Sequence, residues 1–129
     1  MFVTVLVMDD AVVVRKRIVA MLSEVKEIDQ ILEADTTQSA ANLIEAYQPR
    51  VIILDIQVPG TTELRNGIDV LKWVRHRYPH MHVIMISNFD IPRYRDTCNA
   101  SGAAHFFDKS SEFEQLPHAV KDLLADVAA

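Results

Sequence analysis

The sequence has one cysteine, no long hydrophobic run and no excess of positive charge, and each shortage excludes a class of protein. Cys98 has no partner for an intramolecular disulfide, which favours a reducing, cytoplasmic location. No apolar stretch approaches the roughly 18 residues that a membrane-spanning helix needs. The net charge is −5, from 13 basic and 18 acidic residues, without a basic stripe or zinc-finger spacing. We therefore expect a soluble protein that binds neither membranes nor nucleic acid directly.

The length and the beginning of the chain indicate one cytoplasmic domain. The first residues, MFVTVLVMDD, have no positively charged leader, and their apolar run continues directly into two acids, unlike a signal peptide. With 129 residues, of which 50% are hydrophobic and 24% charged, the chain has the composition of a globular domain with one core. We expect residues 1–129 to form a single domain.

Short apolar runs of strand length alternate with helical patterns along the chain. The runs are Thr4 to Met8, Ile31 to Ala34, Val51 to Leu54, Val83 to Ile86 and His105 to Phe107. The helical pattern is weakest from Pro92 to Ser101, and a capping box from Ser111 to Glu114 is predicted to open the last helix, whose apolar stripe includes Val127. Five strands, each followed by a helix, predict an α/β fold. We expect a doubly wound, five-stranded parallel sheet in the flavodoxin-like order 2-1-3-4-5, with helices on both faces.

Polar residues stand where four of the five predicted strands end. Asp9 and Asp10 follow the first strand, Asp55 the third, Ser87 the fourth and Lys109 the fifth. The carboxyl ends of parallel strands form one edge, and its crevice opens between the first and third strands in this order. Three carboxylates there cannot all stay ionised without a cation, and an oxygen-only ligand set favours Mg²⁺ or Mn²⁺. The sequence predicts a divalent metal site at this edge.

Four short motifs carry these residues: VMDD, VIILDIQVPG, VIMIS and SGAAHFFDKS. Together they resemble the receiver domain of two-component response regulators over essentially the whole chain. The resemblance implies a cytoplasmic phosphorylation switch and not an enzyme. No sequence typical of an output domain follows residue 127, so we expect a stand-alone regulator similar to those of chemotaxis, or a regulator without its output domain.

The resemblance implies roles for the acids and the residues beside them. Asp55 corresponds to the phosphoacceptor, which takes a phosphoryl group from a sensor histidine kinase or a phosphotransfer protein. Asp10 corresponds to a direct metal ligand and Asp9 to one that acts mainly through water. Asp55 also binds the metal, and the backbone carbonyl of Gln57 supplies a further oxygen.

The resemblance also implies how the signal leaves the domain. Lys109 pairs with the acceptor and then with the phosphoryl group, Ser87 is the switch hydroxyl, and Phe106 is the switch aromatic, whose ring moves inward. The face made by the fourth helix, the fifth strand and the last helix should then change. Its partner is a downstream protein, or a second copy of this chain in a homodimer.

Two other functions fit part of the pattern. A pseudo-receiver would act as an interaction module without phosphorylation, but all five polar positions are present. An aspartyl-nucleophile phosphohydrolase would also use Asp, Lys and Mg²⁺, but its nucleophile usually lies in an Asp-x-Asp motif on the first strand. A third reading, in which Asp9 only caps the first helix, does not account for its neighbour Asp10.

Two stretches depart from the family pattern. Gly67 stands twelve residues after Asp55, so the intervening loop is longer than in many receivers and is interpreted as a tolerated surface insertion. Lys109 is followed by Ser110, where receivers usually have a proline, often in a cis peptide. The geometry of that turn is left open by the sequence.

Overall fold

The computed structural model describes residues 1–88 and 91–128, with the side chains of 126–128 also left outside the description, including that of Val127. The strands are β1 (Thr4–Met8), β2 (Gln30–Ala34), β3 (Val51–Asp55), β4 (His82–Ser87) and β5 (His105–Asp108). The helices are α1 (Val12–Leu22), α2 (Thr37–Tyr47), α3 (Gly67–Arg77), α4 (Pro92–Ala100) and α5 (Leu116–Ala128), with the 3-10 turn η1 (Phe113–Gln115) before α5.

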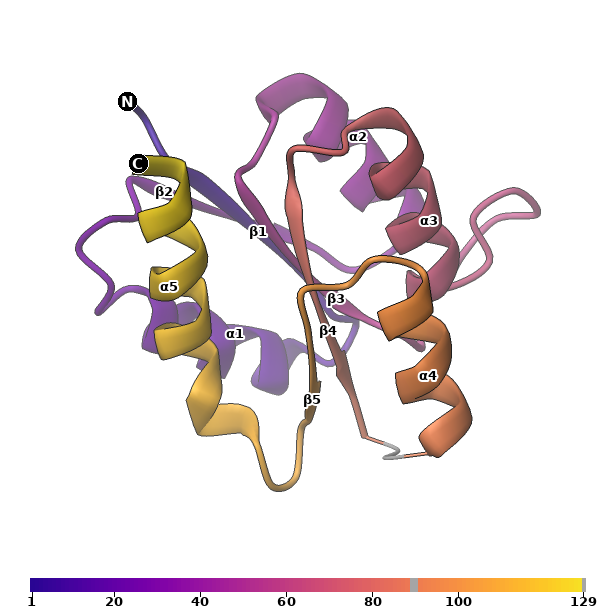
Figure 1. The fold of residues 1–129 in the computed structure, drawn as a ribbon. Coiled ribbons are helices and arrows are strands. Elements are labelled where there is room, and N and C mark those ends of the chain that lie inside the picture. The colour runs from indigo at the N-terminus through magenta and orange to yellow at the C-terminus, as the bar shows by residue number, and fades with distance from the viewer. Residues whose placement is uncertain (89–90, 129) are drawn as a thin grey trace.

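The five strands form one parallel sheet in the order β2-β1-β3-β4-β5, which confirms the predicted topology. Helices α1 and α5 cover one face of the sheet, and α2, α3 and α4 cover the other (Figure 1). The order reverses at β1, so β3 runs beside β1 on the side away from β2. The carboxyl ends of β1 and β3 are therefore neighbours, as a crevice at this edge requires.

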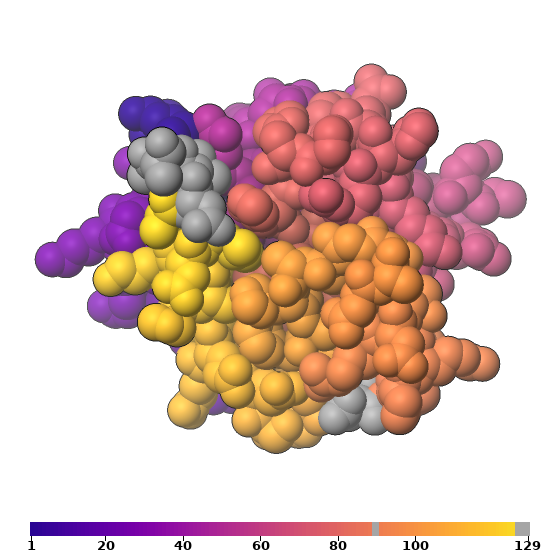
Figure 2. All heavy atoms as spheres, viewed as in Figure 1, coloured from indigo at the N-terminus to yellow at the C-terminus, as the bar shows by residue number. Residues whose placement is uncertain are grey.

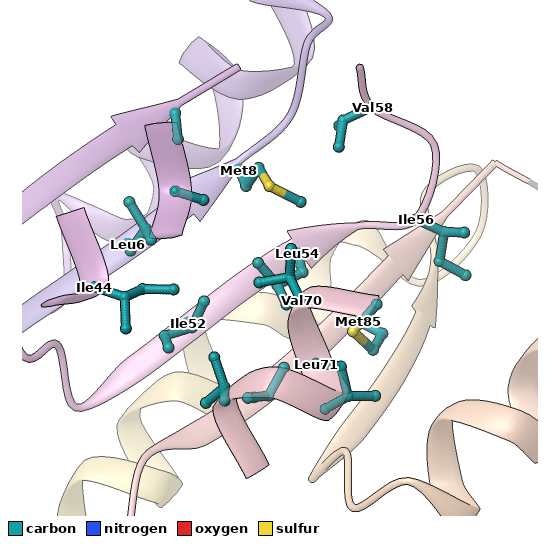
Figure 3. Packing of buried hydrophobic residues seen from close by; sticks show 14 of the residues in the cluster. Leu6, Met8, Ile44, Ile52, Leu54, Ile56, Val58, Val70, Leu71 and Met85 are labelled. Atoms are coloured by element: carbon teal, nitrogen blue, oxygen red, sulfur yellow. The ribbon is translucent and has the colours of Figure 1, made fainter. Parts of the chain in front are cut away.

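The central strands are buried on both faces, which explains their continuous apolar sequences. Every residue of β1 and β3 is buried. Val7 and Ile53 pack among residues of α1 and α5. Leu6 and Leu54 point to the other face and pack among residues of α2 and α3 (Figure 3). These two cores hold the ends of β1 and β3 in place.

The last helix, α5, begins differently from the prediction. The prediction of a capping box from Ser111 to Glu114 is wrong. The chain first makes the 3-10 turn η1, and no side chain caps this turn. A capping box is present instead at the start of α2, where Thr36 accepts a hydrogen bond from the N–H of Ser39 and the Ser39 hydroxyl accepts one from the N–H of Thr36. Pro117 lies in the first turn of α5, where a missing N–H is tolerated.

Helix α4 has few contacts with the core, as its weak apolar pattern predicts. Cys98 is its one fully buried side chain, whereas Val70, Leu71 and Val74 of α3 are all buried. Low burial makes an element easy to displace. No helix in the described part of the chain is long and apolar enough to cross a membrane.

The loop between β3 and α3 is anchored to the body of the protein at its beginning, while residues 59–63 are exposed, as expected of a surface insertion. Ile56 and Val58 are buried in the core shown in Figure 3. Thr37, at the start of α2, donates its N–H to the carbonyl of Pro59 at 3.0 Å and its hydroxyl to the carbonyl of Leu64 at 2.7 Å. The first part of the loop therefore leaves Asp55 along a fixed path.

Replacing Gly67 with alanine is expected to destabilise the protein and to disturb Asp55. A Cβ atom at Gly67 would clash with the backbone of Asp55 and Ile56, where no flexible side chain can move aside. Overpacking of this kind typically costs about 1–3 kcal/mol of unfolding free energy. Urea unfolding measures the loss, and amide chemical shifts around Asp55 report the displacement. Unchanged stability together with unchanged shifts would contradict this expectation.

Candidate functional site

The polar residues predicted from the strand ends lie around one cleft of about 220 Å³. The cleft is lined by Asp9, Asp10, Ala11, Asp55, Gln57, Ser87, Asn88 and Lys109. Phe106 is not among them: its side chain is buried in the core that α2, α3 and α4 cover. The sheet thus brings together the predicted acids, lysine and serine from four strand ends.

Asp9 is fully buried and is held by the first turn of the following helix. Its Oδ1 accepts a hydrogen bond from the N–H of Ala11 at 2.9 Å, and its carbonyl accepts one from Arg15 at 2.8 Å. Asp9 is not the N-cap of α1, because that position is occupied by Ala11 without a side-chain cap. The backbone and one carboxylate oxygen are therefore fixed, and the other oxygen faces Lys109.

Lys109 is a buried cation shared by two carboxylates. Its Nζ lies 2.6 Å from Oδ2 of Asp9 and 3.2 Å from Oδ2 of Asp55, and its side chain is 4% exposed. The pairing with Asp55 was expected, whereas the shorter contact with Asp9 was not. The strand-end pattern places Lys109 at the correct edge but does not show which acid its flexible side chain reaches.

The negative charge of Asp55 is only partly compensated. Burial raises the pKa of Asp55 to about 6 from its ordinary value of 3.8. The ammonium of Lys109 lowers this pKa, the charge of Asp9 raises it, and a hydrogen bond from the N–H of Gln57 lowers it. Removal from water thus outweighs the attraction of one lysine, and a further cation would favour the ionised form.

In EDTA, Asp55→Asn is expected to stabilise the fold near pH 7 but not near pH 4. The folded protein keeps a proton on Asp55 up to about pH 6, whereas the unfolded chain releases it near 3.8. The folded state therefore binds more protons in this window, so the free energy of unfolding of the wild type falls as the pH rises. The difference between the pKa of Asp55 in the folded and the unfolded chain corresponds to about 3 kcal/mol of unfolding free energy.

Urea unfolding of both proteins from pH 4 to pH 8 tests this expectation. The stability difference should open between pH 4 and pH 7, and Mg²⁺ should narrow it by favouring the ionised carboxylate. A difference that stayed constant across this range would show that Asp55 has an ordinary pKa in the folded chain.

The three acids fit a divalent cation. Asp9, Asp10 and Asp55 each offer a carboxylate oxygen, and these oxygens lie within 4.8 Å of one another. When all are ionised, three carboxylates face the one ammonium of Lys109, which leaves an excess of two negative charges. Oδ2 of Asp9 receives no hydrogen bond of regular geometry from the described residues, although the ammonium lies 2.6 Å away. An exposed Asp10 beside two buried acids leaves room for water ligands, which Mg²⁺ usually keeps.

Ser87 and Phe106 occupy neighbouring strands but different environments. Ser87 is 1% exposed at the end of β4, and its carbonyl accepts the N–H of Lys109 at 2.9 Å. Phe106 is 4% exposed, and the guanidinium of Arg95 lies 4.7 Å from its ring centroid. The ring expected to move inward is thus already inside in this structure. Arg95 was missed by sequence reasoning, since nothing local pairs it with an aromatic eleven residues later.

The turn after Lys109 is closed by side-chain hydrogen bonds. No peptide bond between described residues is cis, so Lys109 and Ser110 are joined by a trans peptide. Oδ1 of Asp108 accepts the N–H of Ser110 at 2.8 Å and its hydroxyl at 2.7 Å. The N–H of Ser110, which a proline would lack, therefore contributes to the local structure.

Comparison with protein families matches residues 5–121 to the response regulator receiver domain. The Fimbriae Z protein of Salmonella typhimurium is 27% identical over 122 residues, which cover 95% of this chain and 56% of that protein. A protein-glutamate methylesterase/protein-glutamine glutaminase of Clostridium acetobutylicum is 31% identical over 124 residues, which cover 95% of this chain and 35% of that enzyme. Only part of the enzyme is therefore matched.

The fold is shared with solved receiver domains. The receiver domain of NtrX from Brucella abortus superposes with a TM-score of 0.81 at 26% identity, covering 94% of this chain and 98% of that one. In contrast, the chain spans about half the length of the Fimbriae Z protein and of the regulatory protein DegU from Brevibacillus brevis. The similarity to these longer proteins therefore extends over only part of each.

Proposed function

Because this chain belongs to the response regulator receiver domains of two-component signalling, we propose that it is a cytoplasmic switch operated by phosphorylation of Asp55. The observation that carries the proposal is the position of Asp55, a buried carboxylate between an acidic pair and a buried lysine. Its raised pKa and the adjoining cleft support a site that gains a cation and an anionic group together. We propose no enzymatic turnover for this domain.

In the proposed reaction, one oxygen of ionised Asp55 attacks the phosphorus of a phosphohistidine on a histidine kinase or phosphotransfer protein. The new O–P bond gives an acyl phosphate, and the P–N bond breaks so that its electron pair stays on the histidine nitrogen. Lys109, already 3.2 Å from Asp55, would pair with the phosphoryl oxygens. Mg²⁺ or Mn²⁺, held by Asp9, Asp10, Asp55 and the carbonyl of Gln57, would offset repulsion between the anionic reactants.

The proposed output is a change in the face formed by α4, β5 and α5. Figure 2 shows α4, in orange, and α5, in yellow, on the same side of the molecule. Ser87 adjoins the cleft, and its carbonyl is hydrogen-bonded to Lys109 beyond the end of β5. This face would bind a downstream protein or a second copy of the chain, without direct contact to nucleic acid.

A beryllofluoride adduct, formed with Mg²⁺ present, is expected to alter amide exchange mainly between Ser87 and Ser110. The adduct stands in for the phosphoryl group, and α4 is weakly held by the core. The coupling between site and face should be about 1 to 3 kcal/mol, as is usual between two sites. Hydrogen exchange with and without the adduct measures it. Changes confined to the loop after Asp55 would show that this face does not relay the signal.

Ser87→Ala supplies the control for this measurement. The variant should still bind beryllofluoride, because the hydroxyl responds to the phosphoryl group and does not accept it. The exchange changes in α4 and β5 should become smaller. If they persisted at wild-type size, the relay would run through a group other than the Ser87 hydroxyl.

A further inference from the structure

The backbone on both sides of Lys109 is held by two carboxylates. Oε1 of Glu112 accepts the N–H of Asp108 at 3.0 Å. Oδ1 of Asp108 accepts the N–H and hydroxyl of Ser110. The N–H of Glu112 donates back to the carbonyl of Asp108 at 2.8 Å, which closes the turn. The residues before and after Lys109 are thus both fixed by side chains of the same short segment.

Glu112 is itself held by a cation from another element. Nη2 of Arg95 on α4 lies 3.0 Å from Oε1 of Glu112, the same oxygen that accepts the N–H of Asp108. Nη1 of Arg95 donates to the carbonyl of Phe106 at 3.1 Å. The N–H of Asp108 and the ion pair with Arg95 both lower the pKa of Glu112, which keeps this carboxylate ionised. Arg95 therefore joins α4 to the last residues of β5 and to the turn.

The side chain of Lys109 needs a fixed origin to reach two acids at once. Its ammonium must lie near both Asp9 and Asp55, and a four-carbon side chain has many rotamers that do not do so. Its own N–H is bonded to the carbonyl of Ser87, and β5, which ends at Asp108, pairs with β4, so the turn fixes the backbone on the other side of Lys109. A small rotation of that turn would move the ammonium away from one carboxylate.

We infer that Arg95 and Glu112 are positioning residues that direct Lys109 at the phosphoacceptor. Glu112 fixes the N–H of Asp108, and Arg95 fixes Glu112, so the pair reaches Lys109 through the backbone of the residue before it. This role rests on the proposed phosphorylation of Asp55. It also means that displacement of α4 carries Arg95 along and alters the direction of Lys109.

The test is a titration of the Mg²⁺-loaded protein with beryllofluoride, in which the amide chemical shifts of residues around the cleft report binding. Glu112→Ala and Arg95→Gln should each bind the adduct about three to ten times more weakly, the range expected for the net loss of one ordinary hydrogen bond. Arg65→Gln is the control, since Arg65 is exposed and its ion pair with Asp69, of the same 3.0 Å length, includes none of the residues that contact Lys109. That control should bind as the wild type does.

A double-mutant cycle separates positioning from a general structural effect. In a Lys109→Ala background, Glu112→Ala should cause no further loss of affinity, because the group that it positions is absent. If the two losses multiplied, the inference would be overturned. Should Glu112→Ala not fold, Glu112→Gln, which keeps an oxygen acceptor but loses the ion pair, takes its place in the cycle.

The same titration distinguishes this inference from the proposed function. A folded wild-type protein that bound no beryllofluoride would contradict the phosphorylation of Asp55 itself. A wild type that bound it, with variants at Arg95 and Glu112 whose losses were independent of Lys109, would contradict only their positioning role.

Discussion

Asp55→Asn is expected to abolish labelling by acetyl phosphate. The labelling needs an anionic carboxylate oxygen that is accessible from the cleft, and an asparagine amide is not a comparable nucleophile. The neighbouring acids do not replace it: Asp9 has one oxygen bonded to Ala11 and the other against Lys109, and Asp10 is not one of the two acids that Lys109 contacts. Intact-mass spectrometry after incubation with acetyl phosphate and Mg²⁺ detects the phosphorylated protein.

The controls for this result address folding and charge. Urea unfolding of Asp55→Asn under the labelling conditions shows whether the variant is folded, so that loss of labelling can be separated from unfolding. Asp122→Asn removes an equal charge from an exposed position on α5 and should be labelled normally. Labelling of Asp55→Asn at full stoichiometry would assign the acceptor to another residue.

Asp10→Ala is expected to weaken Mg²⁺ binding by at least about tenfold. A hard cation loses a charged oxygen ligand, and even changes to groups that only support metal ligands typically cost 10- to 100-fold. Asp10 is the exposed member of the acid cluster, so its removal should disturb the fold little. Titration with MgCl₂, followed by the amide shifts of the cleft residues, measures the dissociation constant.

Two comparisons make the Asp10 result specific. Asp122→Ala, which removes a negative charge from the surface of α5, should leave the Mg²⁺ titration unchanged. In Asp10→Ala the ion pair between Asp9 and Lys109 should remain, so the thermal stability in EDTA should stay close to that of the wild type. An unchanged Mg²⁺ affinity in this variant would place the metal outside the acid cluster.

The sequence alone determined the fold and the edge of the sheet that carries the site. The runs that end at Met8, Leu54 and Ile86 are apolar at successive positions, which is required of strands covered on both faces, and the structure buries them in that way. Parallel topology then collects their carboxyl ends at one edge. Asp9, Asp55 and Lys109 could therefore be placed together before any side-chain contact was known.

Only the tertiary structure decided which of these side chains touch. The lysine is nearer to Asp9 than to Asp55, and Arg95 covers Phe106 while holding Glu112. Each contact joins residues far apart in the chain through long side chains that have many rotamers, and no local periodicity encodes the choice among them. Hydrophobic patterning specifies strands and faces because burial is periodic along the chain, whereas the pairing of charges depends on distances that exist only after the sheet and helices have packed.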